Sequence, residues 1–418
     1  MQNYLTMLFN KDIRKNLKYM HDLFKYDKNY TLSNFLKVNN EILNGRKIHN
    51  NGEFTFGVPP IGSKAYRSFI QTAKNHDSAF TDLVLNRKRA PDIFSLAVTA
   101  KCHNNCKFCS AHGHKKGEEL TTNEWQNVIS QIQDLGSCII EFTGGEPLLR
   151  DDLEEIISSI DDRSRSFVAT SGFGLTIKRA ISLKNAGLNG VFISIDSPDS
   201  KENDETRGDG AYETAIKAVK NALKAELCVI INCIIPKNRL NEKYVFEICH
   251  FAQKMGANEI LLIKPLRAGR LLNVKEEPDI YYDNEATEKM QIIYRRAVKK
   301  FKKLKIFSSA LLEWDKTRGC IGGIQLSYIN FTGELFPCDF LPLSFGNVRH
   351  EPLKDIWTKM NVCMGIPKRQ CMCTSLLNEL RNNELPINKE KSLELCKNIR
   401  ETEYPDGYKK FIARCKND

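Results

Sequence analysis

Three cysteines stand close together in the first half of the chain, at Cys102, Cys106 and Cys109. Because they fall within eight residues, their thiolates can converge on one face of an iron-sulfur cubane, whose irons take one ligand each. Three protein ligands leave one iron open, and in zinc enzymes an open position distinguishes a catalytic site from a closed structural one. The loop therefore predicts catalysis at a metal cluster, with a zinc site completed by His112 or His114 as the alternative.

Polar motifs follow three later apolar runs. The first is Thr143-Gly144-Gly145-Glu146-Pro147, where a ligand can approach the backbone because glycine has no Cβ atom. Thr170-Ser171-Gly172 and Ser194-Ile195-Asp196-Ser197 end the next two runs, and Arg207 follows. An arginine suits a carboxylate because it donates two parallel hydrogen bonds. Each motif alone is equally compatible with a cap or turn, so they carry an argument only as a set.

The cysteine loop and the glycine motif together resemble the signature of radical S-adenosylmethionine (SAM) enzymes. The likeness lies in the spacing Cys-x3-Cys-x2-Cys, in Phe108 directly before the last cysteine, and in the glycine motif about 35 residues later. It implies a [4Fe-4S] cluster on the three cysteines, with SAM chelating the open iron. One electron then cleaves SAM to a 5′-deoxyadenosyl radical that abstracts hydrogen from the substrate. Reduced flavodoxin or ferredoxin is the implied electron donor.

The resemblance also implies which residues contact SAM. Arg207 would pair with its carboxylate, and Asn232 is a further candidate. No catalytic residue is implied beyond the cluster, and Tyr212, Tyr328 and Asp339 are candidates by position alone. The expected SAM-contacting residues are Phe108, Gly144, Gly145, Glu146, Pro147, Ser171, Ser194, Asp196 and Arg207.

A second group of cysteines lies in the last hundred residues. The stretch 320–357, with its Gly333-x4-Cys338 pair, resembles the SPASM or twitch extension of radical SAM maturases, which carries one or two auxiliary iron-sulfur clusters. The full SPASM pattern continues Cys-x2-Cys-x5-Cys-x3-Cys, whereas this chain reads Cys363-x7-Cys371-x-Cys373. We therefore expect one auxiliary cluster, with a structural zinc as the alternative. Its expected ligands are Cys320, Cys338, Cys371 and Cys373, with Cys363 as a substitute.

The remaining cysteines have no metal role in this interpretation. We expect Cys396 and Cys415, in the charged tail, to be ordinary cysteines. Strand and helix patterns predict that four others are small core hydrophobes, namely Cys138, Cys228, Cys233 and Cys249.

Alternating apolar runs and amphipathic segments predict the scaffold that positions these motifs. Six short runs between residues 92 and 300 alternate with helical segments, one of which begins at the capping sequence Thr121 to Glu124. This order predicts a parallel sheet of the α/β class that is covered on both faces, and it leaves open whether the sheet closes. The resemblance to radical SAM enzymes implies a partial (β/α)6 barrel. The expected divisions are a helical N-terminal extension of unknown function (1–90), the radical SAM partial barrel (91–305), a small β-hairpin and helix domain for the auxiliary cluster (306–380), and a charged helical tail (381–418). The N-terminal extension is expected to be either a loose appendage or a small helical subdomain.

The composition narrows the classes of binding partner and the cellular compartment that we expect. Lys and Arg number 62 against 51 Asp and Glu, but this +11 surplus is spread along the chain and no basic run is interleaved with aromatics, so we expect no nucleic-acid partner. Apolar stretches fall well short of the roughly 20 residues of a membrane helix. Residues 1–15 lack a signal-peptide pattern, so we expect a cytoplasmic protein. In a reducing compartment, 14 cysteines are metal ligands or core residues more readily than disulfides.

Three functional hypotheses follow. The first is a radical SAM maturase that cross-links or epimerises a ribosomally synthesised peptide, with residues 1–90 gripping a leader segment. The second keeps the chemistry but acts on a small molecule, in tetrapyrrole, haem or other cofactor biosynthesis. The third is a non-catalytic iron-sulfur or zinc scaffold, which predicts no cleavage of SAM.

Overall fold

The computed structural model describes residues 10–31, 34, 58–113, 117–274 and 279–416 of the chain. Its centre is a nine-stranded sheet in the order β7-β6-β5-β4-β3-β2-β1-β8-β9. Strands β1 to β8 pair in parallel, and β9 runs antiparallel to β8. The strands are β1 (Ile93–Thr99), β2 (Ile139–Gly144), β3 (Arg165–Thr170), β4 (Gly190–Ser194), β5 (Cys228–Ile234), β6 (Glu259–Ile263), β7 (Lys305–Ser308), β8 (Leu326–Ile329) and β9 (Leu335–Phe336).

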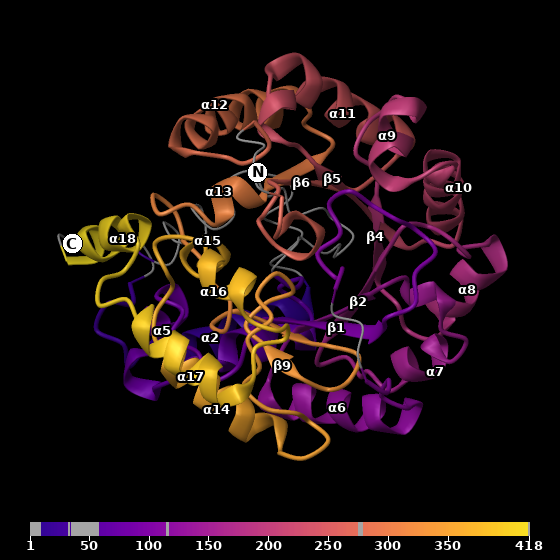
Figure 1. Cartoon of the computed structure of the whole chain (residues 1–418). Helices are drawn as coiled ribbons and strands as arrows, with labels where there is room; N and C mark the ends of the chain where they lie inside the picture. The colour runs from indigo at the N-terminus through magenta and orange to yellow at the C-terminus, as the bar shows by residue number, and fades with distance from the viewer. Residues whose placement is uncertain (1–9, 32–33, 35–57, 114–116, 275–278, 417–418) are drawn as a thin grey trace.

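Helices cover the outer face of this sheet, as they do in a partial barrel. Figure 1 shows the helices from α6 to α12 in an arc outside the strands, with the C-terminal helices on the other side. The arc consists of α6 (Thr122–Leu135), α7 (Leu153–Ser158), α8 (Ile177–Asn185), α9 (Ser200–Arg207), α10 (Ala211–Lys224), α11 (Glu242–Met255) and α12 (Asn284–Lys300). The C-terminal helices are α13 (Ser309–Leu312), α14 (Leu353–Met364), α15 (Met372–Ser375), α16 (Leu377–Asn382), α17 (Lys389–Asn398) and α18 (Asp406–Lys416).

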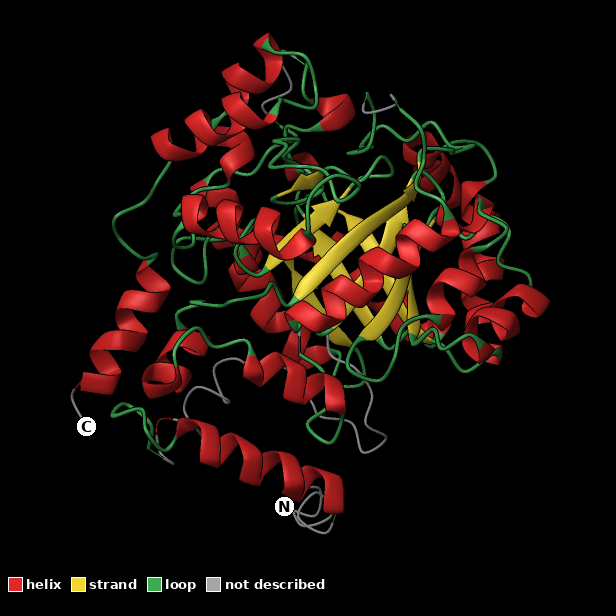
Figure 2. Cartoon of the chain, turned by 90° about the horizontal axis from the view of Figure 1, so that it is seen from below, coloured by secondary structure: helices red, strands yellow, loops and turns green. Residues whose placement is uncertain are grey.

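The two faces of the sheet have different surroundings. On β1, Phe94, Leu96 and Val98 belong to the large core that also contains Trp125 of α6. The intervening residues of each strand face the barrel interior, because successive side chains of a strand point to opposite faces. Figure 2 shows the sheet curving among the helices. Both faces are covered, which explains why the strands read as nearly continuous apolar runs.

The described part of the N-terminal extension is packed against the barrel. Helix α4 (Lys64–Gln71) places Ala65 and Phe69 against Ile93, Ile139 and Phe167, which lie at or near the amino ends of their strands. A second small core joins α4 to α2 (Lys11–Phe24) and α5 (Ala79–Val84). Of the two expectations, these residues therefore fit the small helical subdomain and not the loose appendage, and they close the base of the barrel.

The sheet extends beyond the six expected strands. Strand β7 pairs with β6, and the buried ion pair of Lys305 with Glu259 joins them at 3.1 Å. A four-residue run that contains a lysine gives no clear strand signal, which is why residue 305 was expected to end the barrel. The expected hairpin is present as β8 and β9, but it continues the barrel sheet through β1.

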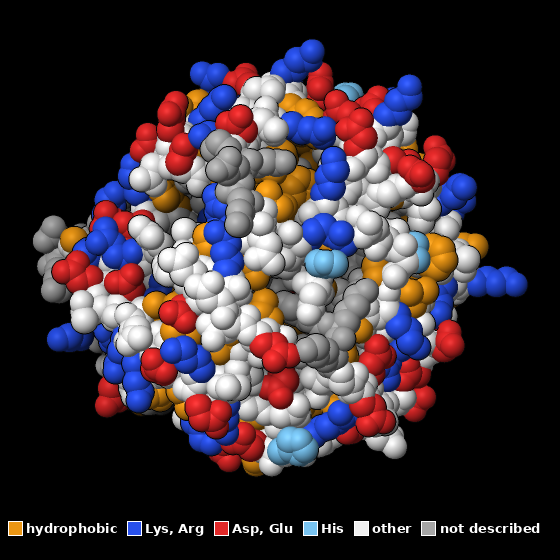
Figure 3. Space-filling view, in the orientation of Figure 1, with side chains coloured by type: hydrophobic (Ala, Val, Ile, Leu, Met, Phe, Trp, Pro, Cys, Tyr) orange, Lys and Arg blue, Asp and Glu red, His pale blue; other side chains and the backbone are white. Residues whose placement is uncertain are grey.

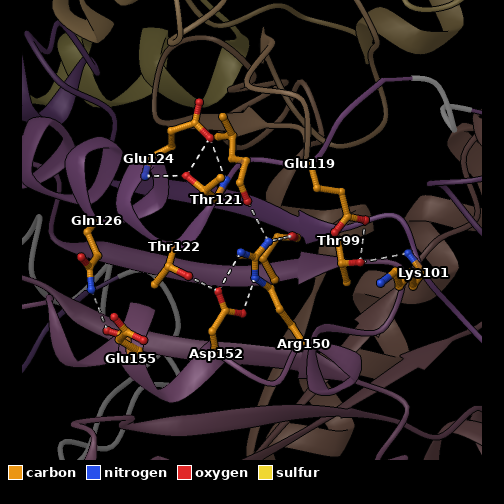
Figure 4. A network of polar contacts seen from close by, with 12 residues as sticks. Thr99, Lys101, Glu119, Thr121, Thr122, Glu124, Gln126, Arg150, Asp152 and Glu155 are labelled. Atoms are coloured by element: carbon orange, nitrogen blue, oxygen red, sulfur yellow. Dashed lines mark hydrogen bonds and ion pairs between the residues drawn. The ribbon is translucent and has the colours of Figure 1, made fainter.

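Arg150 ties both sides of the cysteine loop to the barrel (Figure 4). Its guanidinium donates to the carbonyls of Val98 (2.8 Å) and Leu120 (3.0 Å), on either side of the loop. The same group holds both carboxylate oxygens of Asp152, at 2.7 and 2.9 Å. Since the side chain of Arg150 is only 11% exposed, this charge is satisfied almost entirely by the protein.

Glu119 and Arg349 secure the same loop from its far end. Glu119 accepts hydrogen bonds from the Thr99 hydroxyl and the Ala100 amide, both at 2.8 Å (Figure 4). Arg349, from the C-terminal region, donates to the Glu119 carbonyl at 2.9 Å and pairs with Glu124 of α6 at 2.7 Å. The loop therefore begins and ends at fixed points. In the described part of the chain, no helix has the length and apolar character needed to cross a membrane.

We expect the substitution Arg150→Met to lower the free energy of unfolding by about 2 to 4 kcal/mol, because it leaves two carbonyls and a carboxylate without their donor. Urea denaturation followed by tryptophan fluorescence measures this loss.

Arg163 provides the matched control, since it also contacts two carboxylates, Asp161 and Asp134, but its side chain is 41% exposed. Arg163→Met should cost less than about 1 kcal/mol, because exposed ion pairs are screened by solvent. Equal losses in the two variants would contradict a special role for Arg150.

Candidate active site

The three N-terminal cysteines lie in the loop that follows the carboxyl end of β1. Cys102 is exposed, whereas Cys106 and Cys109 are half-buried. Burial raises the pKa of Cys106, the Arg207 guanidinium opposes that shift, and the thiols of Cys109 and Cys102 add to it. The Cys106 thiol also lies 3.7 Å from the Arg207 carbonyl. The Cys106 thiol therefore lies next to the end of α9 and interacts electrostatically with the other two thiols.

The glycine motif is explained by the cysteine loop itself. The amides of Gly145 and Glu146 donate to the carbonyls of Thr99 (2.8 Å) and Lys101 (2.7 Å). A Cβ on Gly144 would lie 2.3 Å from the Thr99 oxygen, and one on Gly145 would lie 2.1 Å from the Lys101 oxygen. The missing Cβ atoms thus admit the neighbouring backbone, and the expected contact of this motif with a ligand stays a prediction.

Glu146 joins two motifs that the sequence presents separately. Its buried carboxylate accepts from the hydroxyls of Thr170 (2.7 Å) and Ser171 (2.5 Å) and from the Ser171 amide (2.8 Å). Pro147 then begins a short 3-10 turn, η2 (Pro147–Leu149), whose Leu148 amide also donates to Glu146. Glu146 and Ser171 were both expected to contact SAM, and here they contact each other.

Asp196 and Arg207 form a second polar centre, two residues beyond the end of β4. Asp196 is 2% exposed and pairs with Arg207 at 2.8 Å. It also accepts from the Ile234 amide (2.8 Å) and the Thr206 hydroxyl (3.1 Å). Burial acts to lower the pKa of Arg207, but the Asp196 charge outweighs it and the pKa is raised. Arg207 is therefore a permanent cation beside the cysteine loop.

Two buried polar atoms at these strand ends have no hydrogen-bond partner among the described residues, Arg207 Nε and Asn232 Oδ1. Asn232 lies beside Ser194 in the register of β5 and β4. A buried polar atom without a hydrogen bond destabilises the fold, so such atoms mark positions where a ligand can complete the hydrogen bonding. Arg207 beside the cysteine loop thus offers a donor and Asn232 on β5 an acceptor, and both suit an amino acid derivative such as SAM. Phe108, also expected here, is half-buried in the cysteine loop.

The C-terminal cysteines form two distinct groups. Cys371 lies against Cys320 and Cys373, and Cys373 lies against Cys338. Contact with its two neighbours lowers the pKa of the Cys371 thiol, and the same contacts raise those of Cys320 and Cys373. Three separate segments thus bring together the four cysteines expected to hold the auxiliary cluster.

Cys363, the expected substitute, instead lies against Cys396 and connects α14 with α17. No set of three or more His, Cys, Asp or Glu side chains in the described residues is arranged around a single metal ion. A [4Fe-4S] cluster instead takes one cysteine at each of its four irons.

A row of polar side chains crosses the barrel interior between the two cysteine groups. Tyr328, Ser95 and Glu141 are neighbours in the register of β8, β1 and β2, and the Ser95 hydroxyl donates to Glu141 at 3.0 Å. Burial raises the pKa of Glu141 to about 7, against a smaller opposite effect of Ser95. Burial likewise raises the pKa of Tyr328, and the charges of Asp339 and Cys109 add to this rise.

Glu141 was missed by the sequence analysis, although a glutamate inside an apolar strand was a usable signal. Burial also raises the pKa of Asp339 to about 7, with contributions from the charges of Glu141 and Cys371. Tyr328 and Asp339, named earlier by position alone, therefore lie in the interior near both cysteine groups. Tyr212 lies on α10, with its ring against Phe251 of α11.

Comparisons with known proteins agree with this arrangement. The model of the radical SAM superfamily matches residues 96–252, and that of the SPASM iron-sulfur cluster-binding domain matches residues 320–398. The AdoMet-dependent haem synthase of Nitratidesulfovibrio vulgaris is 30% identical over 283 residues, which cover 63% of this chain and 77% of the relative. The corresponding protein of Oleidesulfovibrio alaskensis is 31% identical, covering 63% and 73%.

Solved structures share the fold at lower sequence identity. Streptococcus suis SuiB bound to precursor peptide SuiA has a TM-score of 0.57 and 15% identity, covering 86% of this chain and 88% of its own. The anSMEcpe structure with bound AdoMet has a TM-score of 0.52 and 15% identity, covering 78% and 99%. The resemblance drawn from the cysteine and glycine motifs is confirmed. This chain belongs to the radical SAM superfamily, carries a C-terminal SPASM domain, and uses iron-sulfur clusters and SAM as its cofactors.

Proposed function

We propose that this chain cleaves SAM at a [4Fe-4S] cluster held by Cys102, Cys106 and Cys109, and modifies a substrate bound in the barrel interior. The observation that carries the proposal is that the interior row interacts electrostatically with both cysteine groups. Tyr328 interacts with Cys109 of the first group, and Asp339 interacts with Glu141 of the row and with Cys371 of the second group. When bound, the cluster supplies the electron that splits SAM into methionine and a 5′-deoxyadenosyl radical, which takes a hydrogen atom from the substrate.

The residues of the chain would bind SAM and orient it at the strand ends. Arg207 Nε and Asn232 Oδ1 would hydrogen-bond polar groups of SAM, since neither has a partner in the described protein. Glu146 holds the ends of β2 and β3 together, so the ligand would meet preorganised strand ends. The packing of α4 on the strand bases keeps water from entering at the opposite end.

The four C-terminal cysteines would hold an auxiliary cluster that accepts an electron from the substrate. Asp339 follows Cys338 directly and interacts electrostatically with Cys371 and with Glu141 on the interior row. This arrangement suits oxidations, in which the substrate loses an electron after it has lost hydrogen.

The substrate we propose is a ribosomally synthesised peptide that is cross-linked or epimerised. The interior row offers hydroxyl groups and a carboxyl whose pKa lies near 7, and such neutral groups match the uncharged donors and acceptors of a peptide backbone. SuiB, a protein of this fold, was solved with a precursor peptide bound.

Tetrapyrrole modification is the second candidate. It is favoured by the two relatives of 30% and 31% identity that are named AdoMet-dependent haem synthases. The carboxyl groups of Glu141 and Asp339 would disfavour it once they ionise, above a pKa of about 7, because tetrapyrrole side chains commonly carry carboxylates of their own and like charges repel.

Replacing cysteines tests the assignment of the two clusters. After anaerobic reconstitution, the wild type should contain about eight irons, and both a Cys102→Ala, Cys106→Ala, Cys109→Ala variant and a Cys371→Ala, Cys373→Ala variant about four. With dithionite as reductant, only the first variant should fail to form 5′-deoxyadenosine.

Two results would contradict this assignment. Zinc in place of iron at the N-terminal loop would support the scaffold hypothesis. Unchanged iron content in the Cys371 and Cys373 variant would show that these cysteines hold no auxiliary cluster. A Cys363→Ala, Cys396→Ala variant serves as its matched control.

A substrate assay separates the two candidates. Coexpression with a short precursor peptide encoded beside the gene should yield a peptide that has lost a hydrogen pair or has gained deuterium from heavy water, as measured by mass spectrometry. If the peptide is unchanged and a carboxylated iron porphyrin shifts its Soret band upon binding, the tetrapyrrole proposal is the better one.

Glu141 predicts a pH dependence of stability. Its pKa is about 7 in the folded chain against 4.5 for an ordinary glutamate, so between these values the unfolded chain releases a proton that the folded chain retains. Ionisation therefore favours unfolding, and stability falls as the pH rises through this window. Glu141→Gln should remove that cost, so its stability relative to wild type should improve by roughly 2 to 3 kcal/mol from pH 4 to pH 8.

Urea denaturation at several pH values measures this difference. The exposed Glu155, changed to Gln, is the control and should show nearly the same difference from wild type at every pH. A pH-independent difference for Glu141→Gln would contradict the raised pKa, because it would show that the interior solvates the ionised carboxylate as well as water does.

A further inference from the structure

We propose that an exposed apolar patch formed by Phe173, Ile177 and Ile181 docks an acidic one-electron carrier protein of the flavodoxin or ferredoxin class, beside the N-terminal cysteine loop. This inference rests on the proposed function, since cleavage of SAM requires an external source of single electrons. It adds the surface on this chain that receives the donor.

The patch stands out from the rest of the described surface. Phe173, Ile177 and Ile181 are 42%, 36% and 45% exposed, and they make up three of the six large hydrophobic side chains exposed in the described residues. Ile177 and Ile181 lie one turn apart on α8, and Phe173 precedes that helix. Clustered apolar exposure of this kind marks interaction surfaces, whereas single exposed hydrophobic residues are ordinary.

The patch touches the cysteine loop directly. The Phe173 ring packs against the ring of His103, with centroids 3.9 Å apart and planes at 36°. His103 is bonded to Cys102, which is exposed in the same loop. Because electron transfer slows steeply with distance, a carrier seated on Phe173 would be placed next to the cluster ligands.

The charges around the patch favour an acidic partner. Residues 100–113 and 171–185, which contain the loop and α8, include five Lys or Arg and no Asp or Glu. Arg179 is neutralised by Glu154 of α7 at 2.6 Å, whereas Lys101, Lys107 and Lys178 are exposed. Figure 3 shows hydrophobic side chains and a histidine gathered near α8, with Lys and Arg side chains and, farther out, Asp and Glu side chains around them. Such a field steers an oppositely charged partner toward the surface.

The position of α8 distinguishes this occupant from the substrate. The helix belongs to the outer arc in Figure 1, whereas the substrate would bind in the interior. A carrier on the outside and a substrate on the inside can thus reach the same loop at once.

The test compares two reductants in the full-length reconstituted enzyme. An Ile177→Asp, Ile181→Asp variant should form 5′-deoxyadenosine about tenfold more slowly than wild type with reduced flavodoxin, and within about twofold of wild type with dithionite, which needs no docking surface. Ile292→Asp on α12 is the matched control, because Ile292 is also exposed (54%) and should leave both rates unchanged within about twofold.

A Lys178→Glu, Lys184→Glu variant tests the charge without altering the apolar patch. It should raise the flavodoxin concentration needed for half-maximal rate and weaken the dependence of that concentration on salt.

Several results would overturn the proposal. These are unchanged rates with flavodoxin in both variants, an equal loss with both reductants, or a wild-type dimer that the isoleucine variant converts to a monomer. If the wild type cleaves no SAM with dithionite, the proposed function itself fails. If the wild type cleaves SAM with dithionite, and all variants react with flavodoxin at the wild-type rate, only the proposed docking surface fails.

Discussion

Close contact between two stretches of backbone organises the whole candidate site. The cysteine loop lies on the glycine motif, and the amides of Gly145 and Glu146 donate to the loop carbonyls of Thr99 and Lys101. This approach leaves no room for a Cβ at Gly144 or Gly145. A ligand loop that emerges from one strand is thus held by the end of the next strand, and the positions of its thiols depend on that contact.

Buried charges extend the same organisation along the sheet. Glu146 connects the ends of β2 and β3, and Asp196 connects the region beyond β4 with β5 and with Arg207. Each carboxylate accepts several hydrogen bonds, which is the condition under which a buried charge stabilises a structure. The ends of β2 and β3, and those of β4 and β5, are therefore fixed to one another by buried carboxylates.

The parts of the site that depend on local sequence could be predicted. The cysteine loop, the glycine motif and the four clustered C-terminal cysteines were found from residue type and spacing, because ligands of one cluster must recur at short intervals or in a known pattern. The parts set by tertiary packing could not. The pairing of Asp196 with Arg207, the packing of α4 on the barrel base and the interior position of Glu141 depend on which strand ends become neighbours.

The pairing of β8 with β1 has a consequence for how the two halves of the chain relate. A strand at the border of a sheet presents unsatisfied amides and carbonyls that invite association with other chains. Here β8 covers that border of β1, from which the cysteine loop emerges. The SPASM region is thus part of the barrel sheet itself, and it protects the strand that precedes the cysteine loop from intermolecular pairing.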